Sequence, residues 1–256
     1  MSGMKKLAVF ILALLPVLAF VPEREALPES AEGETRYAVH FIRGNIKVKM
    51  ATATLQLHEG SWQEKPAYNA SFTVRAANVF KLFLLNEYKV HLFLSKADMH
   101  PYYYAFPHKK KGKQRHLEFF YREQEVESVL RIGDNPEPVR RVFPVDDRPT
   151  MDVASMSFFL RSIDPTALKD KPLRVNLLLA SMAVPADVCY IGTDSSFWPG
   201  ESTQHLMVKM QGRGLMENGA GDEIHLWISQ APERAIRGLQ VNLGKNAVVA
   251  KMERPE

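Results

Sequence analysis

The chain contains a single cysteine, Cys189, among its 256 residues. One cysteine cannot form an intramolecular disulfide, so the stability of the folded state must come from core packing. Cys189 lies in the alternating stretch Val188–Ile191, where burial would raise the pKa of its thiol and suppress its reactivity. We therefore interpret Cys189 as a core residue rather than as a nucleophile.

Short motifs that would identify an enzyme or a metalloprotein are also missing. The sequence has no Gly-x-Ser-x-Gly, no His-Glu-x-x-His and no Cys-x-x-Cys. Of the eight histidines, His91, His100 and His225 could approach one another only through folding. The sequence therefore predicts no catalytic residues, no metal site and no cofactor.

The chain carries little excess charge, with 33 Lys and Arg against 29 Asp and Glu, a formal net charge of +4. This excess is too small to indicate a nucleic-acid partner. After Val21 no apolar run reaches the roughly 20 residues that a membrane-spanning helix requires. These absences favour a protein that is soluble or peripheral to a membrane and that binds no nucleic acid.

The first 26 residues have the pattern of a secretory signal peptide. Lys5 and Lys6 precede the apolar run Leu7–Val21, and polar residues follow directly. Cleavage is expected after Ala19 or Ala26, and no cysteine is present there to carry a lipid. We expect an exported protein that is not a lipoprotein, and the lack of a disulfide favours a bacterial periplasm.

Residues 27–34 are acidic and rich in turn formers, which predicts a flexible leader before a single β-rich domain at 35–253. Apolar residues alternate along many short segments of that domain, as expected for half-buried strands. Strands are expected at 37–41, 46–50, 67–74, 87–95, 101–107, 114–123, 125–132, 139–145, 173–182, 184–192, 203–212, 223–229, 239–243 and 247–252.

Two segments interrupt this alternation. Residues 78–85 read as a short buried helix, and residues 150–162 place Met151, Ala154 and Phe158 at helical spacing, with Thr150 or Asp152 as the cap. The fold class is therefore mainly β. We expect a strongly curved antiparallel sheet or incomplete barrel of about a dozen strands, with one or two short helices, one of which covers an open end or face.

The order of these elements resembles the exported bacterial proteins grouped as domain-of-unknown-function family 3108. The resemblance rests on soft patterns of apolar, Asp and Pro positions that together cover nearly all of the mature chain. They are the hairpin Tyr37–Leu57, the stretch Tyr88–Pro101, the helix Asp152–Arg161 and the C-terminal segments 223–229, 235–236 and 248–252. The resemblance implies an exported β-rich fold akin to envelope carriers with curved half-barrels, and no assigned reaction.

Two neighbouring segments are candidate binding sites. The aromatic side chains of Tyr102, Tyr103, Tyr104 and Phe106 could stack on sugars or line an acyl pocket, or they could simply pack in the core. The basic run 108–116 could contact anionic lipid headgroups or polysaccharide, or could be a solvated hairpin tip. Its cations are Lys109, Lys110, Lys111, Lys113 and Arg115.

Charged residues near the predicted second helix raise further alternatives. Asp146 and Asp147 are adjacent carboxylates of the kind that glycosidases use in pairs, but such acids more often cap a helix or pair with a neighbour such as Arg148. Arg161 lies on the same helix as Asp152 but not at i,i+4 spacing. If Arg161 points inward, it needs a buried acid or a ligand anion.

These observations favour a non-enzymatic binding or carrier module for a hydrophobic or amphipathic ligand. The alternatives are an envelope glycan hydrolase and an adaptor that binds protein through an exposed strand edge. The candidate partners are a lipid, a glycan or an envelope protein, and the sequence leaves the oligomeric state open.

Overall fold

The structure is a computed structural model that describes residues 34–77, 87–110, 113–135, 137–179, 182–211, 223–231 and 234–254. The predicted signal peptide, residues 27–33 of the predicted leader, and the helix expected at 78–85 lie outside these ranges.

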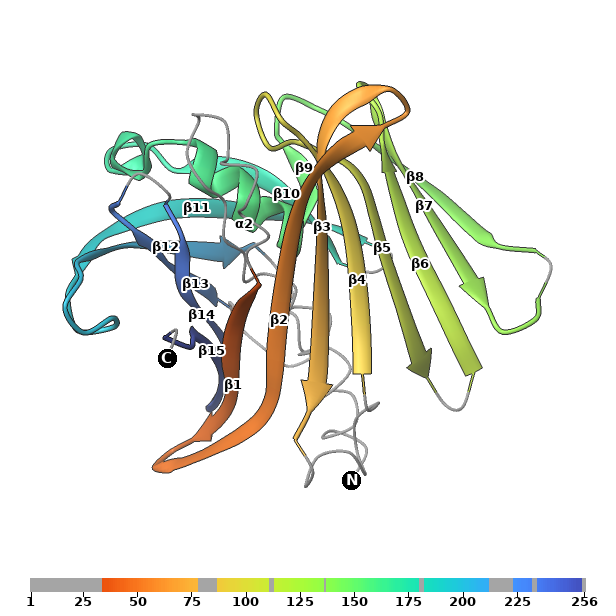
Figure 1. Cartoon of the computed structure of the whole chain (residues 1–256). Coiled ribbons are helices and arrows are strands. Elements are labelled where there is room, and N and C mark those ends of the chain that lie inside the picture. Colours follow the sequence, from red (N-terminus) through yellow and green to blue (C-terminus); the bar gives the residue numbers. More distant parts are fainter. Residues whose placement is uncertain are drawn as a thin grey trace.

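The described residues form one curved, open sheet of fifteen strands (Figure 1). The first half contains β1 (Thr35–Arg43), β2 (Ile46–Trp62), β3 (Lys65–Ala76), β4 (Glu87–Ser95), β5 (Pro101–Lys110), β6 (Lys113–Tyr121), β7 (Glu125–Ile132) and β8 (Val139–Pro144). The second half contains β9 (Thr150–Asp152), β10 (Leu173–Leu179), β11 (Met182–Asp194), β12 (Thr203–Met210), β13 (Glu223–Ser229), β14 (Ile236–Leu243) and β15 (Asn246–Met252). The predicted curved, mainly antiparallel β fold is confirmed, although the strand count exceeds the expected dozen.

The chain starts in the middle of the sheet and builds each half in turn. Strands β1 to β8 run as a meander to one edge, and the chain then crosses to β9 at the other edge and returns through β10 to β15. Strand β15 pairs antiparallel with β1, from Tyr37 opposite Met252 to Arg43 opposite Asn246. This pairing makes the two halves one continuous sheet, whose edges are β8 and β9.

The helix predicted at 150–162 is present but shorter. Helix α2 spans Val153–Ser162, and the three residues before it form β9, which pairs in parallel with β10. The parallel pair requires a long connection, which α2 and the 3-10 helix η3 (Pro165–Leu168) supply. The sequence pattern extended the helix too far because Met151 matches both the helical spacing and a buried strand position.

Strand β2 continues to Trp62, twelve residues beyond the predicted end at Met50. Its alternation there depends on Ala51 and Ala53, which are small and weak strand formers, so the local signal is poor. Both alanines are buried because β2 pairs with β1 on one side and with β3 on the other. Pairing with β1 and β3 therefore makes this segment a strand, although its local sequence has only a weak strand preference.

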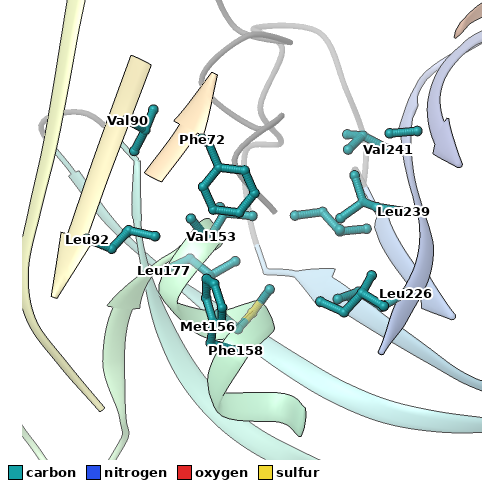
Figure 2. Close-up of a cluster of buried hydrophobic side chains, with 14 of the residues drawn as sticks. Phe72, Val90, Leu92, Val153, Met156, Phe158, Leu177, Leu226, Leu239 and Val241 are labelled. Atoms are coloured by element: carbon teal, nitrogen blue, oxygen red, sulfur yellow. The ribbon is translucent and has the colours of Figure 1, made fainter. Parts of the chain in front are cut away.

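Helix α2 lies inside the curve of the sheet and completes the core (Figure 2). Eight of its ten residues are buried, among them Met156 and Phe158. The ring of Phe158 meets Phe72 of β3 edge-on at 6.2 Å. Leu226 and Leu239, on β13 and β14, are also fully buried in this cluster. Each such side chain contributes about 1.5–3 kcal/mol by its removal from water.

The carboxylate of Asp152 fastens α2 to the sheet. Its Oδ1 accepts hydrogen bonds from the backbone N–H groups of Ala154 at 2.9 Å and Ser155 at 3.0 Å, as an N-cap does. Its Oδ2 accepts from the hydroxyl of Tyr121 on β6 at 2.8 Å. Burial raises the pKa of Asp152, and the hydrogen bonds from Ser155 and Tyr121 oppose that rise.

We predict that Asp152→Ala lowers the free energy of unfolding by about 3 kcal/mol, because a buried cap and its charged hydrogen bonds are lost together. Chemical denaturation monitored by circular dichroism measures the change. Asp147→Ala is the control, since Asp147 is exposed and its replacement should change stability by less than about 0.5 kcal/mol. Equal effects of the two substitutions would contradict the role assigned to Asp152.

Candidate functional site

Alternation along β4 and β5 sends one set of aromatic rings outward, away from α2. Tyr103 is paired with Phe93 across the two strands, while their neighbours Leu92 and Tyr104 are paired on the core side. Phe93 and Tyr103 are each half-buried. The outer face of β4 and β5 therefore carries aromatic side chains that the core does not use.

Four rings gather on this face and form what we term the outer aromatic cluster: Trp62, Phe93, Tyr103 and Phe120. Trp62 stacks on Tyr103 with centroids 4.7 Å apart and lies 4.8 Å from Phe93. Phe120 of β6 lies 5.2 Å from Tyr103. Such contacts add about 0.5–1.5 kcal/mol per pair beyond area burial, so they hold the rings in fixed orientations.

A recess of about 390 Å³ opens beside this cluster. The rings of Phe93 and Tyr103 supply an apolar wall, and polar groups of Asn69, His91 and His116 share the lining. Its lining is completed by Ala105 and Pro107. The volume lies within the range of small-molecule sites, and the mixture of apolar wall and few polar groups is typical of them.

The two histidines of the recess are held in the neutral form. Burial lowers the pKa of His91, and the nearby charges of Lys89 and His116 lower it further. Burial likewise lowers the pKa of His116, with a further contribution from Arg131. The Nε2 atom of His116 is buried and has no hydrogen-bond partner among the described residues. A neutral imidazole has one nitrogen that donates a hydrogen bond and one that accepts it.

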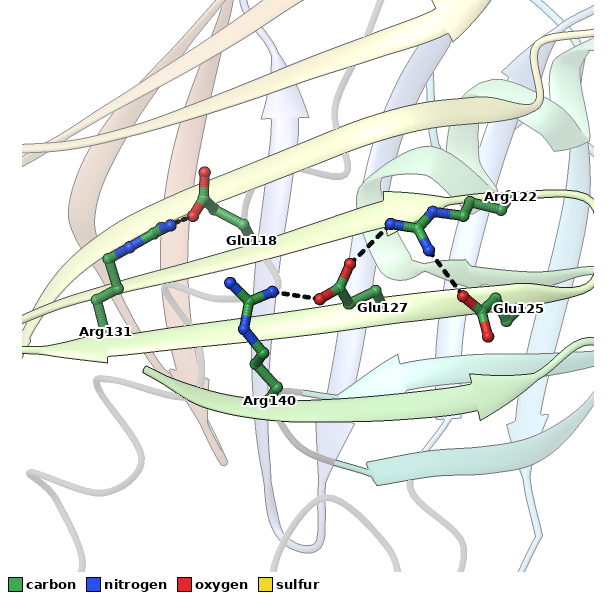
Figure 3. Close-up of polar contacts among 6 residues, drawn as sticks. All are labelled: Glu118, Arg122, Glu125, Glu127, Arg131 and Arg140. Atoms are coloured by element: carbon green, nitrogen blue, oxygen red, sulfur yellow. Dashed lines mark hydrogen bonds and ion pairs between the residues drawn. The ribbon is translucent and has the colours of Figure 1, made fainter. Parts of the chain in front are cut away.

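Charged side chains support the recess from β6 and β7 (Figure 3). The hydroxyl of Tyr103 donates to Glu118 Oε1 at 2.7 Å, and Arg131 pairs with the other oxygen of Glu118. Farther along the same face, Glu127 bridges Arg122 and Arg140. The bond to buried Glu118 orients Tyr103, and Arg131 holds the Glu118 carboxylate in place.

The remaining aromatic candidates have other surroundings. Tyr104 and Phe106 are buried in the core, where Tyr104 stacks on Phe119 and Phe106 on Tyr88. Tyr102 lies beneath the ammonium group of exposed Lys65, 5.7 Å from its ring centroid. The structure therefore brings only Tyr103 of the predicted aromatic set to the recess.

Arg161 points inward, and its guanidinium Nε donates to the backbone carbonyl of Arg234 at 2.6 Å. This contact joins the end of α2 to the segment that leads into β14. It gives Arg161 a structural role in the core.

The basic run lies where β5 meets β6, whose ladder ends with Lys110 opposite Lys113. Lys109 is one position from that end, and Arg115 is half-buried on β6. Lys111 and the side chains of 108–110 and 113 lie outside the described residues. The run is thus placed at the end of a long hairpin.

The adjacent acids lie in the loop between β8 and β9, and both are exposed. Asp146 Oδ1 accepts from the backbone N–H of Arg148 at 2.8 Å and from the side-chain amide of Asn176 at 3.1 Å. Asp146 therefore shapes the loop beside β10. Among the described residues, no group of three or more His, Cys, Asp or Glu side chains is placed to hold a metal ion.

Cys189 is half-buried, and its neighbour Val188 faces the core instead. Burial raises the pKa of the Cys189 thiol, with a further contribution from the charge of Asp187. The interpretation of Cys189 as a core residue is therefore wrong, because its side chain lies on the face of β11 opposite to that of Val188.

The outer face also carries a second cluster of rings, around Trp227 of β13, which the sequence did not predict. Trp227 stacks on Phe197 at 3.9 Å and on His205 at 4.6 Å, and its indole N–H donates to Asp194 Oδ2 at 2.9 Å. His205 Nε2 lies 2.9 Å from His225 Nδ1. The spacing of His225 and Trp227 places them on one face of β13, but the partner His205 depends on cross-strand register.

We predict that stability falls on acidification from neutral pH through the titration of His205. Burial lowers the pKa of His205 in the folded state, with a further contribution from the charge of His225 and an opposing one from Asp194. The contribution of neutral His205 to the free energy of unfolding is fully present above the histidine pKa of the unfolded state, about 6.5. It is lost as the pH falls through the lower pKa of His205 in the folded state. His205→Gln should flatten the pH dependence of the free energy of unfolding below about pH 6.5. Parallel pH profiles for wild type and variant would contradict this prediction.

The ring edge of Phe197 also approaches Gly238 of β14, where a Cβ atom would come within 2.2 Å of Phe197 Cζ. We predict that Gly238→Ala displaces Phe197 and costs about 1–3 kcal/mol of unfolding free energy. In a Phe197→Ala background the same substitution should cost much less, because the clash is gone. A double-mutant cycle by denaturation measures the coupling, and additive effects would refute the contact.

Comparison with known proteins shows the family of this chain. The model of the family DUF3108, described as a protein of unknown function, matches residues 36–253. This chain belongs to the DUF3108 family. The family resemblance read from the sequence is therefore confirmed over most of the chain.

Solved structures with similar folds are distant in sequence. The crystal structure of a β-barrel-like protein of the domain of unknown function DUF1849 from Brucella abortus matches with a TM-score of 0.54 and 11% identity, covering 93% of this chain and 98% of that one. The lipoprotein LppX of Mycobacterium tuberculosis matches with a TM-score of 0.29 and 11% identity, covering 96% and 93%. The first likeness shows a shared fold, and no inference is drawn from the second. Comparison with curated proteins gave no match.

Within the described ranges, no helix has both the length and the apolar character needed to cross a bilayer.

Proposed function

We propose that this DUF3108 protein is a non-enzymatic binding module of the bacterial cell envelope, and that the recess on the outer face of β4 to β6 binds an amphipathic ligand. The observation that carries the proposal is the recess itself, where the rings of Phe93 and Tyr103 form an apolar wall beside His116, whose buried Nε2 has no hydrogen-bond partner among the described residues. Buried polar atoms normally have partners, so an unpaired nitrogen in a recess favours a ligand that supplies one.

The chemistry of the recess selects the class of ligand. A flat apolar group of the ligand, such as one face of a sugar ring or an aromatic ring, would cover Phe93 and Tyr103. A hydroxyl or amide at its edge would pair with His116 and with the side-chain amide of Asn69. The volume of about 390 Å³ suits a head group or a single ring rather than a complete two-chain lipid.

Placement in the envelope rests on the N-terminal pattern, in which Lys5 and Lys6 precede the run Leu7–Val21. Two features favour binding over catalysis. The sequence carries no catalytic motif, and Asp146, the better placed of the adjacent acids, is engaged in shaping its loop.

Native mass spectrometry tests the proposal on protein expressed with its own N-terminal segment and purified from a Gram-negative envelope without detergent. We predict a discrete added mass that Tyr103→Ala reduces at least tenfold in occupancy, because the ring forms one wall of the recess. Tyr102→Ala is the matched control, since Tyr102 is the adjacent tyrosine and does not line the recess.

Thermal unfolding of both variants checks that each remains folded. An added mass that both variants retain, or that both lose alike, would refute the assignment of the recess. A protein that never carries an added mass would count against a ligand-binding function.

A further inference from the structure

One end of the sheet combines exposed apolar side chains with a cluster of basic residues. We term it the hairpin end and define it by residues 43–49 and 244–246. The β1–β2 turn lies at one end of the sheet in Figure 1. Arg43 pairs with both Ile46 and Asn246, which places the β14–β15 turn beside the β1–β2 turn.

The β1–β2 tip projects from the sheet. Residues 43–49 are all exposed, and β2 pairs with β3 only from Ala51 onward. Two of the exposed residues are large and apolar, Ile46 at 63% and Val48 at 38% relative exposure. Both are β-branched residues that favour a strand, but their exposed side chains bury little apolar area in the fold.

The charge around these residues has one sign. Segments 35–58 and 236–252 form β1, most of β2, β14 and β15, and they contain no Asp or Glu. Arg43, Lys47 and Lys245 are exposed at the hairpin end.

The positive charges near the β1–β2 turn also affect the pKa of His40. His40 of β1 has a lowered pKa, first because of burial and then because of the charges of Lys47 and Lys49, while Glu253 acts in the opposite direction. Lys49 itself pairs with Glu253 at 2.9 Å, whereas Lys47 remains at the tip beside Ile46 and Val48. Positive charge interleaved with exposed aliphatic side chains matches the boundary of an anionic bilayer, where cations meet phosphates and apolar groups enter the acyl edge.

We propose that the hairpin end docks on an anionic phospholipid surface, with Ile46 and Val48 entering the headgroup boundary and Arg43, Lys47 and Lys245 contacting lipid phosphates. This inference goes beyond the proposed ligand recess, which lies on the outer face of β4 to β6, and either one can fail without the other.

Vesicle flotation tests the docking surface with the full protein. The two probes are vesicles of phosphatidylcholine alone and vesicles that also contain phosphatidylglycerol. The protein is expected to float with the anionic vesicles and to remain unbound with the zwitterionic ones. Lys47→Gln should weaken the partition about fivefold, as expected for one cation near an anionic surface. Ile46→Ser/Val48→Ser should weaken it at least tenfold.

Two control variants separate the hairpin end from general surface properties. Ile191→Ser removes a side chain of β11 that is 50% exposed, and Lys169→Gln removes an exposed cation that follows η3. Neither should change the partition. Since all five altered residues are exposed, circular dichroism should show an unchanged fold for every variant.

Three results would overturn the proposal. The first is equal flotation with both kinds of vesicle, and the second is no flotation with either. The third is binding that Lys47→Gln weakens but Ile46→Ser/Val48→Ser leaves intact, which would mean contact with a polyanion such as an acidic polysaccharide rather than a bilayer.

Discussion

The pairing of β1 with β15 is the constraint on which the rest of the structure depends. It joins residues near the two ends of the described chain, from Tyr37 opposite Met252 to Arg43 opposite Asn246, and so turns two meanders into one sheet. The pairing closes a loop of about 200 residues, an entropic cost that must be offset by the contacts that the joined halves make. Those contacts are the shared core around α2, where Phe72 of the first half and Leu226 of the second are fully buried.

Helix α2 explains why the candidate binding face is the outer one. The helix is buried on nearly every side and fills the curve of the sheet with Met156, Phe158 and Leu160. The alternation of β4 and β5 then leaves Phe93 and Tyr103 on the opposite face, where no helix of the described chain covers them. A strand with aromatic residues on both faces thus serves the core with Tyr104 and the recess with Tyr103.

Much of the fold could be predicted from the sequence, and particular residues show where prediction stopped. The strand at Glu87–Ser95 alternates cleanly and was predicted with its observed bounds, and Asp152 was one of the two caps expected for α2. Strand β9 was missed because three residues give no periodicity, and its assignment depends on pairing with β10. The site was harder to predict. Tyr103 could be separated from Tyr104 only by knowing which face meets α2, and His205 meets Trp227 only through the register of β12 and β13.

The most direct test of the account is a crystal structure of the protein purified from its native source, with the ligand that it retains. We predict ligand density in the recess on the outer face, against Phe93 and Tyr103 and within hydrogen-bond distance of His116 Nε2. Ligand density inside the curve of the sheet, beside Met156 and Phe158, would contradict the account, because it would make the concave face the binding face.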